Sequence, residues 1–147
     1  MIKMLKPIFI IVLAIYTSNI AMAQSQDNLY LQCLERHLEK HHNQEGGQLY
    51  IKSVMGITDS MPEEIKGFKI TYLNTDQLKA KTKKEGFVII QIFPITNAEN
   101  ILNLDINEYL TYRNKKRTYL SMHKSSNFKI GCADGQLTII DEYFTGS

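Results

Sequence analysis

The sequence predicts an α+β domain in which an N-terminal helix packs on a curved, mainly antiparallel meander sheet of about five to seven strands. Three observations lead to this fold class. Apolar residues first recur at the period of a helix, then in short extended segments that continue to the C-terminus, and tight turn signals join most of these segments.

The first 23 residues are expected to be a cleavable signal peptide. Lys3 and Lys6 form a basic region, an apolar run follows over residues 8–15, and Ala21-Met22-Ala23 matches the small-x-small cleavage pattern. The run is shorter than the ~20 residues that span a bilayer, so an uncleaved anchor helix is the weaker alternative. We therefore expect residues 24–147 to form a single periplasmic or secreted domain without a further transmembrane span.

The charge of the expected mature domain argues against nucleic-acid binding. The chain carries 17 Lys+Arg and 15 Asp+Glu, and removing Lys3 and Lys6 leaves 15 basic against 15 acidic residues. Nucleic-acid binding is dominated by neutralisation of phosphates, which a nearly neutral domain is poorly suited to supply. The predicted partner is an unknown protein or small ligand of the cell envelope.

A helix is expected from about residue 28 to residue 43. Asp27 or Ser25 can cap its N-terminus, and Gly46-Gly47 ends it. Its apolar positions, among them Leu34 and Leu38, lie along one side, and its charged residues lie along the other. This pattern is typical of a helix that packs on a core.

Extended segments follow the glycines. Leu49–Val54 is expected to be the first strand, and Phe68–Leu73, with clean alternation, the second. Phe87–Phe93 is apolar at almost every position and is closed by Pro94, which predicts a central strand buried on both faces. The loop between the first two strands, over residues 59–64, is expected to hold a short helical turn.

A short lysine-rich helix is expected between the second strand and the central one. Asn74 or Thr75 caps it, it covers Asp76–Lys84, and Gly86 ends it.

The pattern of the C-terminal third predicts consecutive antiparallel strands. Asp134-Gly135 is a strong hairpin signal because both residues tolerate positive φ. The expected elements are strands over residues 102–112, 118–122, 128–132 and 137–144, with a basic turn at residues 113–117. Cystatin-like and NTF2-like sheets are similar to this plan in architecture only, because no motif identifies either family and a fold does not fix a function.

Cys33 and Cys132 are expected to form one disulfide. An exported chain with an even number of cysteines favours pairing over free thiols or metal ligation. In the chain-entropy model a loop of this length would stabilise the fold by about 4–5 kcal/mol. The bond would tie the N-terminal helix to a strand near the C-terminus.

Cys33, His37 and His41 recur at intervals of four and would share one side of the helix. Three such positions span about 12 Å, which is too far for one metal ion with bonds of about 2 Å. The order is H-x-E-x-H and not the H-E-x-x-H of zinc proteases. We expect no metal site and no cofactor, with His37 and His41 as weak candidates for a metal-binding pair that a further residue such as His123 would complete.

The sequence carries no local signature of an enzyme. It lacks the G-x-S-x-G nucleophile elbow and the glycine-rich phosphate loops. Asp141 and Glu142 are neighbours in an expected strand and so point to opposite faces, which excludes an ordinary carboxylate dyad. No catalytic residue is predicted.

Two basic clusters are the remaining candidates for recognition. One lies on the short helix (Lys79, Lys81, Lys83 and Lys84), and the other lies in the expected turn at residues 113–117. Such clusters suit an acidic protein, an anionic polysaccharide or a membrane surface, although charged turns also keep sheet edges from pairing. The predicted recognition surface is the turn with its flanking tyrosines: Tyr109, Tyr112, Arg113, Lys115, Lys116, Arg117 and Tyr119.

The sequence thus favours a small exported, non-enzymatic binding protein that acts through protein or ligand contact, with an inhibitor or immunity-type role among the options. The alternatives are a small periplasmic enzyme or an apolar-ligand carrier with a pocket between helix and sheet. The enzyme alternative would be supported if His37, His41 or His123 faced a cavity with a perturbed acid or a metal nearby.

Overall fold

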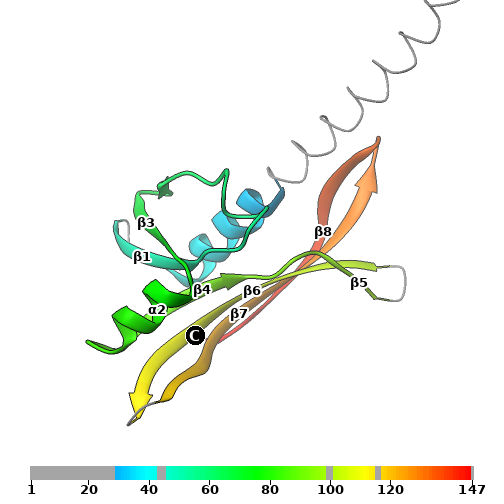
Figure 1. Cartoon of the computed structure of the whole chain (residues 1–147). Helices are drawn as coiled ribbons and strands as arrows, with labels where there is room; N and C mark the ends of the chain where they lie inside the picture. The colour runs from blue at the N-terminus through cyan, green and yellow to red at the C-terminus, as the bar shows by residue number, and fades with distance from the viewer. Residues whose placement is uncertain (1–28, 43–45, 99–100, 115–116, 147) are drawn as a thin grey trace, which may run out of the picture.

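A computed structural model of the chain describes residues 29–42, 46–98, 101–114 and 117–146 (Figure 1). The predicted signal peptide at residues 1–23 and the predicted helix caps Ser25 and Asp27 lie outside these residues. Within the described ranges, no helix has the length and apolar character that a membrane span requires.

The described chain is α+β, as predicted, with two helices and an open, mixed sheet of eight strands. The N-terminal helix covers residues 29–41 of the described chain. The other elements are β1 (Gly47–Lys52), β2 (Glu64–Ile65), β3 (Phe68–Leu73), α2 (Thr75–Thr82), β4 (Phe87–Ile92), β5 (Thr96–Ala98), β6 (Ile101–Asn114), β7 (Arg117–Ala133) and β8 (Gln136–Thr145).

The sheet is not the simple meander of five to seven strands that the sequence predicts. Its order is β2-β3-β1-β4-β6-β7-β8, with β5 paired to β6. β1 lies between β3 and β4 and is parallel to both, whereas β4, β6, β7 and β8 form an antiparallel meander. Parallel strands need a crossover connection, and α2 lies in the connection that runs from β3 past β1 to β4.

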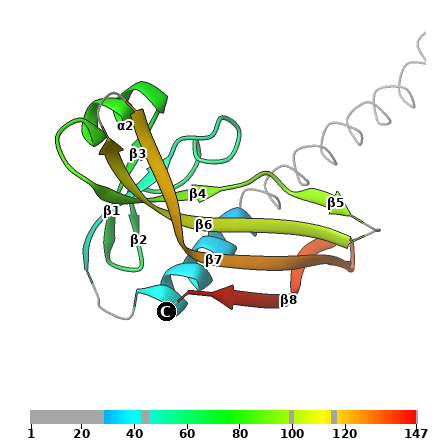
Figure 2. The same cartoon turned by 90° about the horizontal axis from the view of Figure 1, so that it is seen from below.

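The main core lies between the N-terminal helix and one face of the sheet (Figure 2). Leu34 and Leu38 from the helix meet Ile106 and Phe128 from the long strands, and none of these side chains is exposed. Fully burying a side chain of this kind contributes about 1.5–3 kcal/mol. The amphipathic pattern of the helix is therefore confirmed, and the helix is anchored above β6 and β7.

A second, smaller core packs α2 against the sheet. Ile89 on β4 joins Leu73 and Leu78, while its neighbour Ile90 belongs to the main core. The prediction that this strand is buried on both faces is confirmed. Asn74 caps α2: its side chain accepts hydrogen bonds from the backbone N–H groups of residues 76 and 77.

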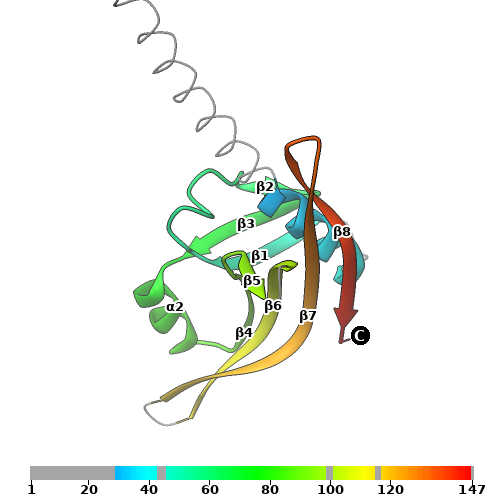
Figure 3. The same cartoon turned by 90° about the vertical axis from the view of Figure 1, so that its right-hand side faces the viewer.

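β6 and β7 are the longest strands and run as curved ribbons to an end beside α2 (Figure 3). The predicted strands at residues 118–122 and 128–132 are parts of the single strand β7. A register shift between Glu108 and Tyr109 leaves one extra residue on β7, which increases the local bend and twist. At the other end of β7, Asp134 and Gly135 have φ values of 52° and 76°, as the hairpin signal predicts.

The predicted disulfide is wrong, because Cys33 and Cys132 are not bonded. Cys33 lies on the buried face of the helix with no exposed surface, and Cys132 lies exposed in β7, just before the turn to β8. Burial raises the pKa of the Cys33 thiol to about 12, so this sulfur is a core atom and not a nucleophile. The expected export of the chain and its even number of cysteines favour a disulfide, but neither says whether the two residues lie close together in the fold.

Candidate functional site

The two basic clusters that the sequence leaves separate meet at one cavity. Lys79 on α2 and Lys83 just after it face Arg113 and Arg117 on the β6–β7 hairpin, around a space of about 440 Å³. Thr118 and Tyr119 complete the described lining. We call this space the basic cavity. The basic cavity forms because the curvature of β6 and β7 places the end of their hairpin beside α2.

The predicted tyrosines take different places. Tyr112 and Tyr119 stand opposite each other in the β6–β7 ladder and stack, with ring centroids 5.3 Å apart and planes 12° apart. Tyr119 lines the basic cavity, whereas Tyr109 packs against the small core beside α2. The structure thus separates Tyr109 from the predicted surface, and the predicted residues Lys115 and Lys116 lie outside the described ranges.

The lysines after Lys79 differ in role. Lys81 lies over the rings of Tyr50 and Phe87, at 4.3 Å and 5.0 Å from their centroids, and pairs with Glu85. It therefore supports the packing of α2. Lys84 is exposed and is not part of the cavity lining, so within this cluster the cavity takes only Lys79 and Lys83.

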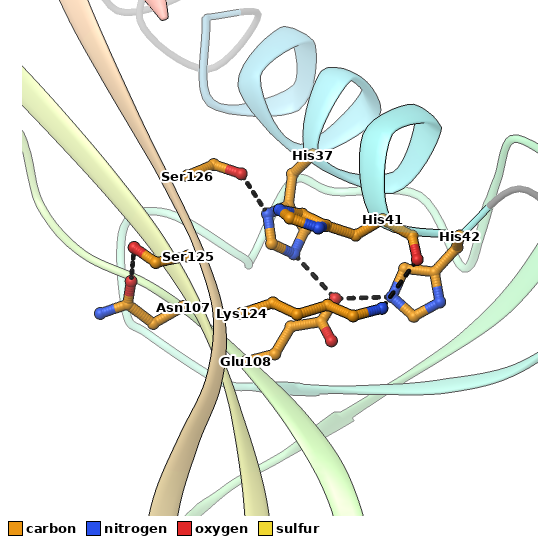
Figure 4. Close-up of polar contacts among 8 residues, drawn as sticks. All are labelled: His37, His41, His42, Asn107, Glu108, Lys124, Ser125 and Ser126. Carbon is orange, nitrogen blue, oxygen red and sulfur yellow. Dashed lines mark hydrogen bonds and ion pairs between the residues drawn. The ribbon is translucent and has the colours of Figure 1, made fainter. Parts of the chain in front are cut away.

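A second group of polar residues lies under the C-terminal end of the N-terminal helix (Figure 4). His37 Nε2 is 3.0 Å and His42 Nε2 is 2.6 Å from the same oxygen of Glu108, Oε1. His37 Nδ1 is 2.7 Å from the hydroxyl of Ser126. We call these four residues the histidine–glutamate network; it joins the helix to β6 and β7.

The network holds a charge inside the fold. His37, Glu108 and Ser126 have no exposed surface, and the side chain of His42 is 20% exposed. Burial alone would raise the pKa of Glu108, but the hydrogen bonds from His37 and His42 lower it below its ordinary value. Burial lowers the pKa of His37, and the carboxylate opposes that shift without cancelling it. An ionised Glu108 beside a neutral His37 is the consistent state, with Nε2–H donating to the carboxylate and Nδ1 accepting from Ser126.

His37 and His41, the weak candidates for a metal-binding pair, do not bond to a common partner. The His41 ring lies beside the His37 ring, 4.8 Å between centroids, and near Phe144. His42, and not His41, joins His37 at Glu108. Among the residues that the structure describes, no three His, Cys, Asp or Glu side chains are arranged to hold a metal ion.

A cavity of about 480 Å³ opens beside the network. Its described lining contains His41, the last residue of the helix, and His42, which follows it, with the segment 46–49 and Phe68. The His42 ring meets Phe68 edge-on at 5.8 Å. We call this space the histidine cavity. An imidazole pair thus faces a cavity next to a perturbed acid, which is the arrangement that the enzyme alternative requires.

Sequence reasoning missed Glu108, His42 and Ser126, although one signal was available. Glu108 has the same parity as Leu104 and Ile106, so an alternating strand turns its carboxylate toward the core. A buried acid at such a position needs partners, and the described residues that supply them, His37 and His42, lie at least 66 positions away in the chain.

Comparison with models of known protein families, with characterised proteins and with solved structures finds no match to this chain.

Proposed function

We propose that this protein is a small exported binding protein that captures an anionic group of its ligand or partner in the basic cavity. One observation carries the proposal: four cationic side chains from two separate segments line the same space, with Tyr119 beside them. Export rests on the sequence of residues 1–23.

The chemistry of the lining favours phosphate, sulfate or carboxylate. An arginine guanidinium can donate two parallel hydrogen bonds to such a group, and lysine adds a compact charge. Asp76 is the one acid paired with a cavity lysine in the described ion pairs; it lies 3.9 Å from Lys79, with side chains 95% and 63% exposed. A pair so exposed contributes little, so it leaves most of the positive charge of Lys79 uncompensated.

The test compares two double variants that each remove two positive charges. Lys83→Ser with Arg117→Ser changes the cavity, and Lys69→Ser with Lys84→Ser changes exposed lysines outside its lining. The probe is a fluorescent fragment of sulfated dextran, titrated at two salt concentrations. We expect the first variant to lose about tenfold or more in affinity and the control to stay near wild type, because the loss of two direct ion contacts exceeds 1.4 kcal/mol.

Equal losses in the two variants would show that only net charge matters, and the proposal would be wrong. If only the cavity variant loses affinity, affinity capture of the mature protein with its own cell envelope identifies the natural partner, with the cavity variant as the negative control.

We also propose that the architecture is related in plan to cystatin-like and NTF2-like sheets. The helix that packs on one face of the sheet and the antiparallel β4-β6-β7-β8 meander support this idea. It carries no functional conclusion.

A further inference from the structure

One edge of β7 is open over the part of the strand that runs to the β6–β7 turn. β8 pairs with residues 125–133 of β7, so among the described strands only β6 lies beside residues 117–122 (Figure 3). β8 ends where Gly146, with a φ of 86°, lies against the backbone of His123 and Lys124 with no room for a side chain. Alternate residues of a strand direct their N–H and C=O groups to opposite sides. Every second residue of 117–122 thus directs its backbone polar groups to the open edge.

The side chains along this open edge are exposed on both faces of the sheet. All seven residues 117–123 are exposed, whereas residues 125–130 of the same strand alternate between buried and half-buried. Tyr119 and Leu120 are 38% and 46% exposed and point to opposite faces, and Met122 is 62% exposed. A partner that covered one face of the sheet would bury only every second residue. A strand added at the edge lies beside the side chains of both faces.

The middle of the open edge is not protected against pairing. Proteins usually protect edge strands with charged residues, prolines, bulges or very short strands. Residues 118–122, Thr-Tyr-Leu-Ser-Met, contain neither a charged residue nor a proline. The extra residue of the register shift, His123, and the charges of Arg117 and Lys124 lie at the two ends of this stretch and not within it. The stretch is therefore able to accept another strand, and its ends limit which strand that is.

The charge at the ends of the open edge favours an acidic partner. The sequence from residue 109 to residue 124 contains five lysines and arginines and no aspartate or glutamate. A second copy of this chain that paired through the same edge would bring the basic ends of the two copies, at Arg117 and Lys124, close together. Like charges placed opposite each other destabilise a strand pair, and opposite charges stabilise it. An extended segment with acidic ends therefore suits this edge better than a second copy does.

We infer that the open edge of β7, residues 117–122, takes up an extended acidic segment of a partner protein as an added strand. Main-chain hydrogen bonds hold the segment, and its apolar side chains cover Tyr119 on one face and Leu120 on the other. Its acidic ends meet Arg117 and Lys124. Arg117 also lines the basic cavity, so an acid at this end supplies the anionic group proposed for that cavity. The inference rests on the proposed function and adds the kind of partner.

The test uses full-length mature protein and a synthetic peptide of alternating valine and threonine with glutamates at both ends. NMR measures the hydrogen exchange of the backbone amides in β7 without the peptide and at saturation. We expect the peptide to slow exchange by about tenfold or more at every second residue of 117–122, because only these direct their N–H groups to the open edge. A peptide of the same sequence with methylated amide nitrogens keeps the charge but lacks the donors, so it should not bind.

Two matched variants distinguish the open edge from the neighbouring strand. Leu120→Glu places a negative charge on the edge of β7, and Leu110→Glu places the same charge on β6, one strand further from the edge. The two leucines are 46% and 47% exposed, so the substitutions are closely comparable. We expect Leu120→Glu to weaken binding of the acidic peptide about tenfold or more and Leu110→Glu to weaken it much less. Urea unfolding checks that both variants fold.

Three outcomes would overturn the inference. Exchange at residues 117–122 that the acidic peptide leaves unchanged is one, and equal binding of the methylated peptide, which would show that charge alone holds it, is another. The third is a dimer in sedimentation whose open edge is protected without peptide, because a second copy would then occupy it. Protein that binds sulfated dextran but not the peptide contradicts only the strand addition, whereas protein that binds the peptide but not dextran contradicts only the basic cavity.

Discussion

At the scale of single residues, the main feature is the buried charge of Glu108. Glu108 places a carboxylate on the same face of β6 as Leu104 and Ile106, with no exposed surface. Removing an ion of this kind from water costs several kcal/mol unless hydrogen-bond donors replace the lost hydration. His37 and His42 supply those donors at Oε1, while Oε2 has no partner among the described residues. The position of Glu108 is thus set by two imidazoles from one helix end.

Replacing Ser126 by alanine tests how strongly the network depends on its outer hydrogen bond. The change removes the partner of His37 Nδ1 and leaves a buried ring nitrogen unsatisfied. We expect the free energy of unfolding to fall by about 1–3 kcal/mol in urea titrations. Ser121→Ala, at an exposed position of the same strand, should change it by less than about 0.5 kcal/mol. Equal effects would argue against a bonded Ser126.

Thiol labelling tests the correction of the disulfide. Cys132 is exposed, whereas Cys33 is buried and the pKa of its thiol is raised to about 12. The native protein should therefore react rapidly with a maleimide at one site, Cys132, and the denatured protein without reductant at two sites. Mass spectrometry of the labelled protein gives both counts. No label in either state would mean that the bond exists after all.

At the scale of elements, α2 depends on its N-cap residue, Asn74, and places two cations at the basic cavity, Lys79 within the helix and Lys83 at its C-cap. Asn74 and Gln77 form a capping box, in which each side chain bonds to the backbone N–H of the other residue. The helix is only 8 residues long, and such short helices are marginal without caps and tertiary contacts. The placement of Lys79 and Lys83 thus depends on a cap that lies outside the cavity.

Asn74→Ala should lower the free energy of unfolding by about 0.5–2 kcal/mol, because two backbone N–H groups lose their acceptor. We also expect weaker binding of sulfated dextran, since a frayed α2 no longer fixes its lysines. Urea unfolding and the dextran titration measure the two effects. Asn74→Ser keeps an N-cap acceptor and should stay close to wild type; a loss as large as that of alanine would show that capping is not the cause.

Elements with strong local signals could be predicted from the sequence, and others could not. Phe68–Leu73 alternates cleanly and matches β3 at both ends, and Asn74 was one of two predicted caps. β2 and β5 contain two and three residues, too few to show a period. The parallel pairing of β1 with β3 and β4 was missed because an alternating strand reads the same whichever direction its neighbours run.

At the scale of the whole molecule, the two cavities show which features could not be predicted from the sequence. Arg113 and Arg117 were predicted as recognition residues from a local cluster. Lys79 and Lys83, which line the basic cavity with them, lie near the two arginines only because β6 and β7 are curved. In the same way, His42 and Glu108 are 66 residues apart and meet because the helix packs on the sheet. Long-range placement of this kind leaves no local pattern in a single sequence.

The same buried groups set how the stability of the whole fold depends on pH. Burial lowers the pKa of His37 and His41 below the ordinary value of 6.5, so the unfolded chain binds protons more readily than the folded one. Their contribution is fully present above pH 6.5 and is lost as the pH falls from there toward the lowered values. The pKa of Glu108 is also lowered, but its contribution is lost only below about pH 4.5.

We therefore expect the urea midpoint to fall between pH 7 and pH 5, before any carboxylate begins to titrate appreciably. Each such histidine contributes a slope of at most about 1.4 kcal/mol per pH unit. His37→Gln should flatten the slope in this range, because the amide does not titrate. A midpoint that is constant from pH 7 to 5 in the wild type would show that the folded and unfolded states take up protons equally in this range, so the lowered pKa of His37, and with it the neutral His37 of the network, would be wrong.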